Sequence, residues 1–313
     1  MSEKKPVNVL FDLDIAGDCT NMGAFSVLHA LADLGEARIL AVTACYHSPY
    51  IAGCIDAVNR YYKRRLPLGT LHRQPPTEHC VFTKEICEEY ESDYPAGAET
   101  ADTVDVLRKA LSEAADHSVL FVVTGCMASM AALLDSPADA FSPLDGRTLI
   151  AQKIEKTIVM GGQFPTFGDA PHAEFNITAQ IPAAQHACEC WPGELILTPF
   201  ELGIRTRTAY RFVQEGTSDN PVRRGYELLR AYRDEKPDDD FPSWDATAVL
   251  QAVRPDAGYF ELHPYGKITV DDKGYTVWSP CEGGKQTYLC PKMPLDEVGE
   301  TITALLLKTP TNR

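Results

Sequence analysis

The chain has 313 residues, 44% of them hydrophobic and 23% charged, a globular composition that excludes a disordered or fibrous protein. Its formal net charge of -15 would repel a nucleic-acid backbone or an anionic membrane, so neither is an expected partner. No apolar run is long enough to span a bilayer, and the start MSEKKPVNVLFD is charged and then strand-like, unlike a signal peptide. We therefore expect a cytoplasmic protein.

In chain order, short apolar runs alternate with helical patterns. The predicted strands are VNVLF (7–11), ILAVTA (39–44), LPLG (66–69), VLFVVTG (119–125), TIVMGG (157–162) and ELILTP (194–199). The predicted helices between them lie near residues 24–34, 51–62, 103–115, 127–134 and 182–190. Strands that are apolar throughout, each followed by a helix, predict an α/β fold with a mostly parallel central sheet and helices on both faces.

Two parts of the chain depart from this alternation. Residues 71–100 are rich in Pro, Glu and His without a clear strand, which indicates an excursion over the sheet edge. After Asn220, two helical patterns flank the predicted loop PDDDFPSWD, and a C-terminal β-hairpin about residues 272–274 precedes a last helix at 295–307. Because no internal repeat or low-complexity linker is present, we expect one domain over residues 1–313.

Ten cysteines are scattered from Cys19 to Cys290 through strand-like and helix-like segments. In a chain of this size, such scatter predicts reduced, mostly buried thiols rather than a disulfide framework. Cys188 and Cys190 form a close pair but lack a second pair at zinc-finger spacing, so core packing is favoured over a metal cluster.

Polar residues follow the predicted strands, where a parallel sheet places its ligand site. The loop after the first strand, FDLDIAGDCTN, gathers Asp12, Asp14 and Asp18 with Thr20 and Asn21. Crowded carboxylates are costly to bury unless a cation or hydrogen-bond donors compensate, and calcium prefers such oxygen ligands. The alternative is structural: Asp18 or Thr20 caps the following helix, and Asp12 is a solvated turn residue.

This loop, written DLDIAGDCTNMGA, resembles the aspartate loop DTDxGxDxDDAxA of the inosine–uridine type nucleoside hydrolases. The segments TGCMASMA, VMGG, AEFN with the following PAA, and WDATAVL match the same family in the same order. The resemblance implies a Rossmann-like nucleoside hydrolase fold and a calcium-binding N-glycosidase that releases ribose and a free base. It also implies a homo-oligomer, as a dimer or tetramer.

The resemblance assigns metal-binding and catalytic roles to residues of this loop and to two residues later in the chain. Asp14 matches the aspartate that binds calcium and activates the attacking water. The paired aspartates that bind the ribose hydroxyls and the metal fall on Thr20 and Asn21, so both carboxylates are absent. A carbonyl near Ala128 and the carboxylate of Asp245 would complete the metal shell.

The ribose contacts implied by the family are partly retained. Glu174 and Asn176 match the residues that hold ribose, whereas Ser48 and Asp169 stand where the family has asparagines. Trp244 replaces the histidine that precedes the late aspartate in well-known members, which removes an imidazole able to protonate the leaving base. The indole of Trp244 would instead stack on a nucleobase, or pack in the core.

Structural alternatives remain open for the other retained residues. The structural alternative for Asp245 is that it caps the helix DATAVLQAV. The alternative for Glu174 and Asn176 is a solvated loop pair, although the functional interpretation is preferred for all three residues. His47 and His172 lie in candidate site loops and are candidate proton donors. Lone histidines are more often surface side chains or buried side chains with their hydrogen bonds satisfied.

Asp18 is a further possible metal ligand. Since Thr20 and Asn21 remove negative charge from the metal shell, we expect calcium binding that is weakened or absent.

Two functional hypotheses follow. The first is a hydrolase that cleaves the N-glycosidic bond of a ribonucleoside or related N-riboside, a small-molecule substrate. The second is a catalytically inactive homologue that acts as a ligand-binding or assembly module. A dinucleotide-dependent oxidoreductase is disfavoured because the first loop is rich in aspartate and lacks G-x-G-x-x-G.

Overall fold

The computed structural model describes residues 5–15, 18–73, 81–236 and 238–311. Positions 16–17 of the aspartate loop, 74–80 of the predicted excursion and the first four residues of the chain lie outside the described residues. Among the described helices the longest has 14 residues, and none is long and apolar enough to cross a membrane.

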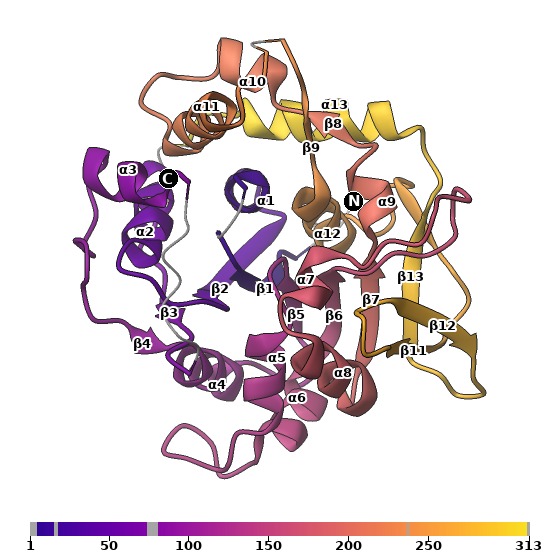
Figure 1. The fold of residues 1–313 in the computed structure, drawn as a ribbon. Helices are drawn as coiled ribbons and strands as arrows, with labels where there is room; N and C mark the ends of the chain where they lie inside the picture. The colour runs from indigo at the N-terminus through magenta and orange to yellow at the C-terminus, as the bar shows by residue number, and fades with distance from the viewer. Residues whose placement is uncertain (1–4, 16–17, 74–80, 237, 312–313) are drawn as a thin grey trace.

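Eleven strands of the described residues join one sheet, which is parallel in its central part and antiparallel at one edge (Figure 1). The strand order is β12-β11-β13-β7-β6-β5-β1-β2-β3-β4, and β10 pairs with β13. The strands of this sheet are β1 (Val7–Leu13), β2 (Ala37–Ala44), β3 (Leu68–Thr70), β4 (Ala101–Asp102), β5 (Val119–Val123), β6 (Ile154–Met160), β7 (Glu194–Thr198), β10 (Phe260–Leu262), β11 (Gly266–Val270), β12 (Thr276–Pro280) and β13 (Gln286–Pro291). A separate two-stranded sheet contains β8 (Arg207–Thr208) and β9 (Phe241–Pro242).

Helices cover both faces of the sheet. In Figure 1, α1, α12 and α13 lie on one side of the strands, and α4, α5, α6 and α8 lie on the other. The helices are α1 (Thr20–Asp33), α2 (Ile51–Tyr61), α3 (Thr83–Glu89), α4 (Thr103–Glu113), α5 (Ala128–Leu134), α6 (Gly146–Lys153), α7 (Phe175–Thr178), α8 (Ile181–Cys190), α9 (Phe200–Gly203), α10 (Tyr210–Glu215), α11 (Pro221–Arg233), α12 (Trp244–Val253) and α13 (Leu295–Leu306).

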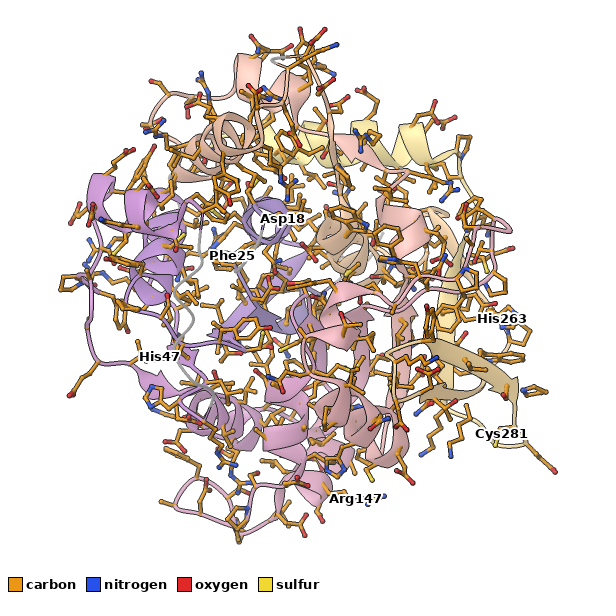
Figure 2. All side chains as sticks on the ribbon, in the orientation of Figure 1. Asp18, Phe25, His47, Arg147, His263 and Cys281 are labelled. Atoms are coloured by element: carbon orange, nitrogen blue, oxygen red, sulfur yellow. The ribbon has the colours of Figure 1, made fainter. Side chains whose placement is uncertain are left out.

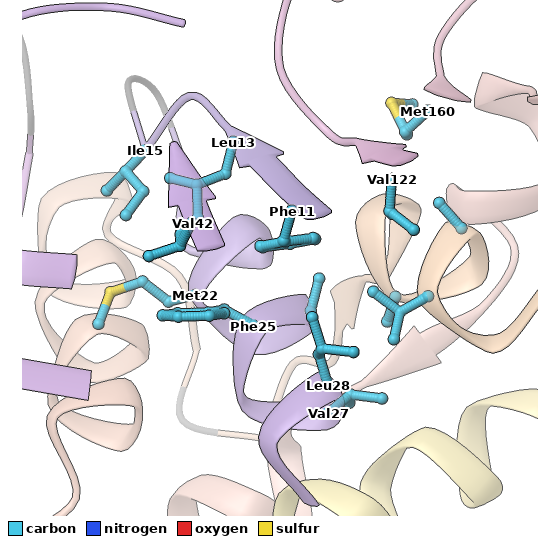
Figure 3. Packing of buried hydrophobic residues seen from close by; sticks show 14 of the residues in the cluster. Phe11, Leu13, Ile15, Met22, Phe25, Val27, Leu28, Val42, Val122 and Met160 are labelled. Atoms are coloured by element: carbon cyan, nitrogen blue, oxygen red, sulfur yellow. The ribbon is translucent and has the colours of Figure 1, made fainter. Parts of the chain in front are cut away.

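The alternating side chains of β1 divide the core into two parts. Phe11 and Leu13 belong to the cluster packed against α1, whereas Leu10 belongs to the cluster on the opposite face. The Phe11 ring stacks on Phe25 of α1 at 5.4 Å, and Figure 3 shows these rings within the first cluster. Because β1 is a central parallel strand buried on both faces, it carries apolar side chains on either side, with Asp12 as a buried polar exception.

The predicted parallel sheet with helices on both faces and a C-terminal hairpin is confirmed. Each of the six predicted strands corresponds to an observed one, with ends that differ by a few residues. The predicted loop PDDDFPSWD is partly wrong, because Phe241–Pro242 pairs with β8 and α12 already begins at Trp244. The sequence also missed β13, which pairs in parallel with β7 and carries the hairpin into the sheet.

Candidate functional site

A cavity of about 240 Å³ opens where the carboxyl ends of the central strands meet the starts of several helices. Asp14 follows β1, Met160 ends β6, and Phe200 follows β7, so the cavity occupies the position expected for a ligand site in a parallel sheet. Its lining residues are Asp14, Asp18, Thr20, Asn21, Met160, His172, Glu174, Phe175, Asn176, Phe200, Arg233, Trp244 and Asp245.

Close backbone packing fixes Asp14 in this cavity. A Cβ atom at Gly125, in the loop after β5, would lie 2.9 Å from both Cβ and N of Asp14, so only glycine allows this approach. Ile15, the next residue, has φ 43°, a left-handed conformation that is unfavourable for a β-branched side chain. The Ile15 side chain is fully buried in the core, which stabilises this strained conformation of the residue after Asp14.

Asn21 holds the Asp14 carboxylate. The amide nitrogen of Asn21 donates to Oδ1 of Asp14 at 2.7 Å, and the amide oxygen accepts from the Asp14 main-chain N–H at 3.3 Å. The hydroxyl of Thr124, after β5, also donates to that amide oxygen, at 2.7 Å. Side chains from the loop after β1, the start of α1 and the end of β5 therefore form one buried hydrogen-bonded group.

Thr20 bridges two further carboxylates. Its hydroxyl lies 2.5 Å from Oδ1 of Asp18 and 2.6 Å from Oδ2 of Asp245. One hydroxyl has a single proton to donate, so close contact with both carboxyl groups requires a second proton. Burial, and then the negative charge of Asp18, raises the pKa of Asp245 well above its usual range. Both observations favour a protonated carboxyl group at this point.

The structure decides three of the structural alternatives. Asp12 is fully buried within β1 and accepts from the Thr43 hydroxyl at 2.6 Å, so its interpretation as a solvated turn residue is wrong. Cys19 is the N-cap residue of α1, although Asp18, the residue before it, accepts from the main-chain N–H of Thr20 at 2.9 Å. Ser243 occupies the N-cap of α12, and Asp245 is the second residue of that helix, so Asp245 is not its cap.

Glu174 and Asn176 are buried, which excludes the interpretation as a solvated loop pair. Glu174 caps α7 by accepting from the N–H groups of Asn176 and Ile177, and it also accepts from Gly162. Burial nevertheless raises the pKa of Glu174 to about 7, against the opposing effect of these N–H donors. The Asn176 amide nitrogen donates to the carbonyls of Thr124 and Met160 at 3.1 Å, so its amide oxygen is the group able to accept from a ligand hydroxyl.

Aromatic rings line another part of the cavity. The Trp244 indole stacks on Phe200 with ring centroids 5.7 Å apart, and its N–H donates to the Phe200 carbonyl at 3.1 Å. His172 packs against the same Phe200 ring at 4.6 Å. Phe175, between Glu174 and Asn176, is 57% exposed although it lines the cavity. A flat apolar ligand group would find stacking partners here.

Three residues that the family resemblance assigns to the site do not line the cavity. Ser48 accepts from the N–H groups of Tyr50 and Ile51 at the start of α2, and Asp169 forms an ion pair with Arg205 at 2.8 Å. Ala128 is the first residue of α5.

His47 hydrogen-bonds to Thr70 of β3, and Figure 2 shows it well apart from Asp18. Burial, with the nearby His72, lowers the pKa of His47. Of the two candidate histidines, His172 alone lines this cavity.

The residues present do not fit a calcium ion of the kind that an aspartate loop implies. Calcium binds through oxygen atoms, but Asn21 turns its amide nitrogen toward Asp14. The Thr20 hydroxyl already lies at hydrogen-bond distance between Asp18 and Asp245. Over the described ranges of the chain, no three His, Cys, Asp or Glu residues are grouped to hold a metal ion.

Sequence reasoning missed the aromatic residues Phe175 and Phe200, the basic residue Arg233 and the buried Thr124. Phe200 directly follows the apolar run ELILTP, so its strand-end position was a usable indication. Arg233 comes from the last turn of α11, and no local pattern predicts that this turn reaches the cavity.

Comparison with known proteins agrees with this architecture. The family model for inosine-uridine preferring nucleoside hydrolase matches residues 9–288, whereas no curated protein matches the sequence. The purine-preferring ribonucleoside hydrolase from Gardnerella vaginalis superposes with a TM-score of 0.71 at 17% identity, covering 96% of this chain and 98% of that one. The inosine-uridine preferring nucleoside hydrolase from Bacillus anthracis gives 0.68 at 15% identity, covering 96% and 99%.

The type III effector protein XopQ, solved in complex with adenosine diphosphate ribose, gives a TM-score of 0.71 at 14% identity and covers 99% of this chain and 95% of its own. At these identities the structural matches show the fold alone. The family match covers most of the sequence, so the chain belongs to the inosine-uridine preferring nucleoside hydrolase family.

Proposed function

We propose that the protein binds an N-riboside in this cavity and hydrolyses its N-glycosidic bond, with a calcium dependence that is weakened or absent. The observation that carries this proposal is the convergence of Asp14, Glu174, Asn176 and Asp245 on one cavity with an aromatic wall. Carboxylate and amide oxygens suit the hydroxyls of a ribose, and the rings suit a base.

In the reaction, the oxygen of water bonds to the anomeric carbon while the C–N bond breaks and its electron pair leaves with the base. Asp14 would orient this water and accept its proton, because its carboxylate is held at the cavity by Asn21. The amide oxygen of Asn176 would accept from a ribose hydroxyl, and His172 would protonate the leaving base. No step depends on a metal ion, since the residues present do not fit one.

A second candidate is a catalytically inactive homologue that binds a riboside without cleaving it. The neutral side chains of Thr20 and Asn21, in place of two carboxylates, favour this alternative, because less negative charge is available to stabilise a cationic transition state. Both candidates use the same cavity and differ in turnover.

The test incubates the protein with inosine, uridine, adenosine and adenosine diphosphate ribose, with calcium or with a chelator, and measures released base and binding. XopQ in its complex motivates the last ligand. Asp14→Asn should abolish turnover, whereas Asp105→Asn, an exposed carboxylate at the start of α4, should not. If the wild type binds a ligand of this panel without cleaving it, and Asp14→Asn loses that binding, the result would support the inactive homologue. A wild-type protein that neither binds nor cleaves the panel would reject both.

We also propose a cytoplasmic homo-oligomer of single-domain subunits. The nine described cysteines are all free thiols, which supports a reducing compartment. Light scattering on the purified protein measures the subunit number directly.

A further inference from the structure

The orientation of the Asn21 amide is determined by its neighbours. The main-chain N–H of Asp14 can only donate, so the Asn21 atom 3.3 Å from it must be the oxygen. Thr124 donates its hydroxyl proton to that same oxygen at 2.7 Å, a shorter contact than its 3.3 Å distance to the Asp12 carbonyl. The amide nitrogen therefore faces Oδ1 of Asp14 at 2.7 Å.

Thr124 also connects this group to the opposite side of the cavity. Its carbonyl accepts from the amide nitrogen of Asn176 at 3.1 Å. Thr124 is fully buried, and Asp14, Asn21 and Asn176 are at most 6% exposed. One residue directly after β5 thus fixes side chains from α1 and α7 relative to each other.

We propose that Thr124 and Asn21 form a hydrogen-bond clamp that positions Asp14 for its ligand without a cation. A buried carboxylate needs compensation, either from a cation or from hydrogen-bond donors. Here the Asn21 N–H group supplies a donor on the Asp14 oxygen, and Thr124 keeps that amide from rotating. Both are positioning residues, and the inference rests on the proposed function only in taking Asp14 as the group that faces the ligand.

Replacing the donor by an acceptor gives the sharpest test. In Asn21→Asp a second carboxylate would stand about 2.7 Å from Asp14, a like-charge contact that a cation relieves. We expect Asn21→Asp to melt at a lower temperature in a chelator and to regain stability with calcium alone, with calorimetric calcium binding. The wild type and Asn21→Ala should show neither effect. Equal calcium binding by the wild type, or none by Asn21→Asp, would overturn the clamp.

The role of the Thr124 hydroxyl is tested by measuring the affinity of the protein for adenosine in the presence of a chelator. Thr124→Val removes the hydroxyl at nearly constant volume and should weaken binding roughly tenfold, whereas Thr124→Ser should restore it. Thr198→Val is the matched control, because Thr198 ends β7, is fully buried, and its hydroxyl has no partner among the described residues. Thr124→Val binding like the wild type would refute the role of Thr124.

The two proposals fail in different ways. If the wild type binds no adenosine, the proposed function fails, and the calcium response of Asn21→Asp still decides the clamp. If adenosine binds but Asn21→Asp ignores calcium, the clamp fails and the proposed function stands.

Discussion

The hydroxyl of Thr20 lies 2.6 Å from Oδ2 of Asp245, although 225 positions separate the two residues in the sequence. Thr20 begins α1 and Asp245 lies in the first turn of α12, so this contact joins the starts of two helices at the cavity. Both side chains are almost fully buried, so the bond forms in a setting of low dielectric constant.

Replacing Thr20 by valine should therefore destabilise the fold. The buried Asp245 carboxyl group would lose its hydroxyl partner, at a cost of about 1–3 kcal/mol in the free energy of unfolding. Denaturation by urea at neutral pH measures this loss. Thr269→Val, on the exposed side of β11, should stay within about 0.5 kcal/mol of the wild type. A loss in Thr20→Val no larger than that control would show that the bond does not stabilise the site.

Gly125→Ala should displace Asp14. The new Cβ would lie 2.9 Å from Asp14 and 2.6 Å from Sγ of Cys45, which forces the loop after β5 to move at a cost of about 1–3 kcal/mol. Adenosine affinity, measured by calorimetry, should fall with it. Gly193→Ala is the matched control, since its nearest neighbour would be 3.8 Å away. Wild-type affinity in Gly125→Ala would mean that the position of Asp14 is not critical.

Trp244→Ala should weaken the binding of nucleosides more than that of free ribose. The indole stacks on Phe200 beside the cavity, and loss of an aromatic stacking partner costs about 1 kcal/mol, roughly a fivefold change in affinity. Competition binding with adenosine and ribose separates the two effects. Trp278→Ala, in the β11–β12 hairpin, should bind both like the wild type. Equal losses for both ligands in Trp244→Ala would argue against base stacking.

Glu201 should make the fold less stable as the pH rises. Its side chain is fully buried, Oε1 accepts from Phe164 and Thr166, and Oε2 has no partner among the described residues. Burial raises its pKa from the ordinary 4.5 to about 7, so the native state binds the proton more tightly than the unfolded chain. The stabilisation of the fold by protonated Glu201 is therefore complete below pH 4.5 and is lost as the pH rises through 7.

Glu201→Gln removes this titration. Between pH 5 and pH 8.5 the free energy of unfolding of the wild type should fall by on the order of 2–3 kcal/mol more than that of Glu201→Gln. Glu174, whose pKa is also raised to about 7, keeps a similar slope in both proteins. Urea denaturation across this range provides the comparison, and parallel curves for the two proteins would contradict the assignment.

The sequence predicted the architecture where periodicity is local and strong. The six apolar runs became strands because most of their residues are buried in the sheet, and their order placed Asp14 at a carboxyl end. The strand Gln286–Pro291 was missed because it follows a hairpin rather than a helix, and its pairing with β7 depends on tertiary packing. The short pair β8 and β9 likewise has no periodicity to detect.

The orientation of the side chains in the site could not be predicted from the sequence. Asn21 could be recognised as an uncharged replacement, but its amide nitrogen faces Asp14 because of Thr124, more than one hundred residues away. Glu174 likewise accepts from the main-chain N–H of Gly162 in the loop after β6, a contact that no local pattern predicts. Such contacts arise only when distant loops meet at the sheet edge.

A crystal structure of the protein with adenosine, grown in the presence of calcium, tests the shared cavity most directly. We expect the ribose hydroxyls within hydrogen-bond distance of Asp14 and Asn176, the base against Trp244, and no ion between Asp14 and Asp245. Adenosine bound elsewhere on the molecule, or a calcium ion coordinated by both aspartates, would contradict this.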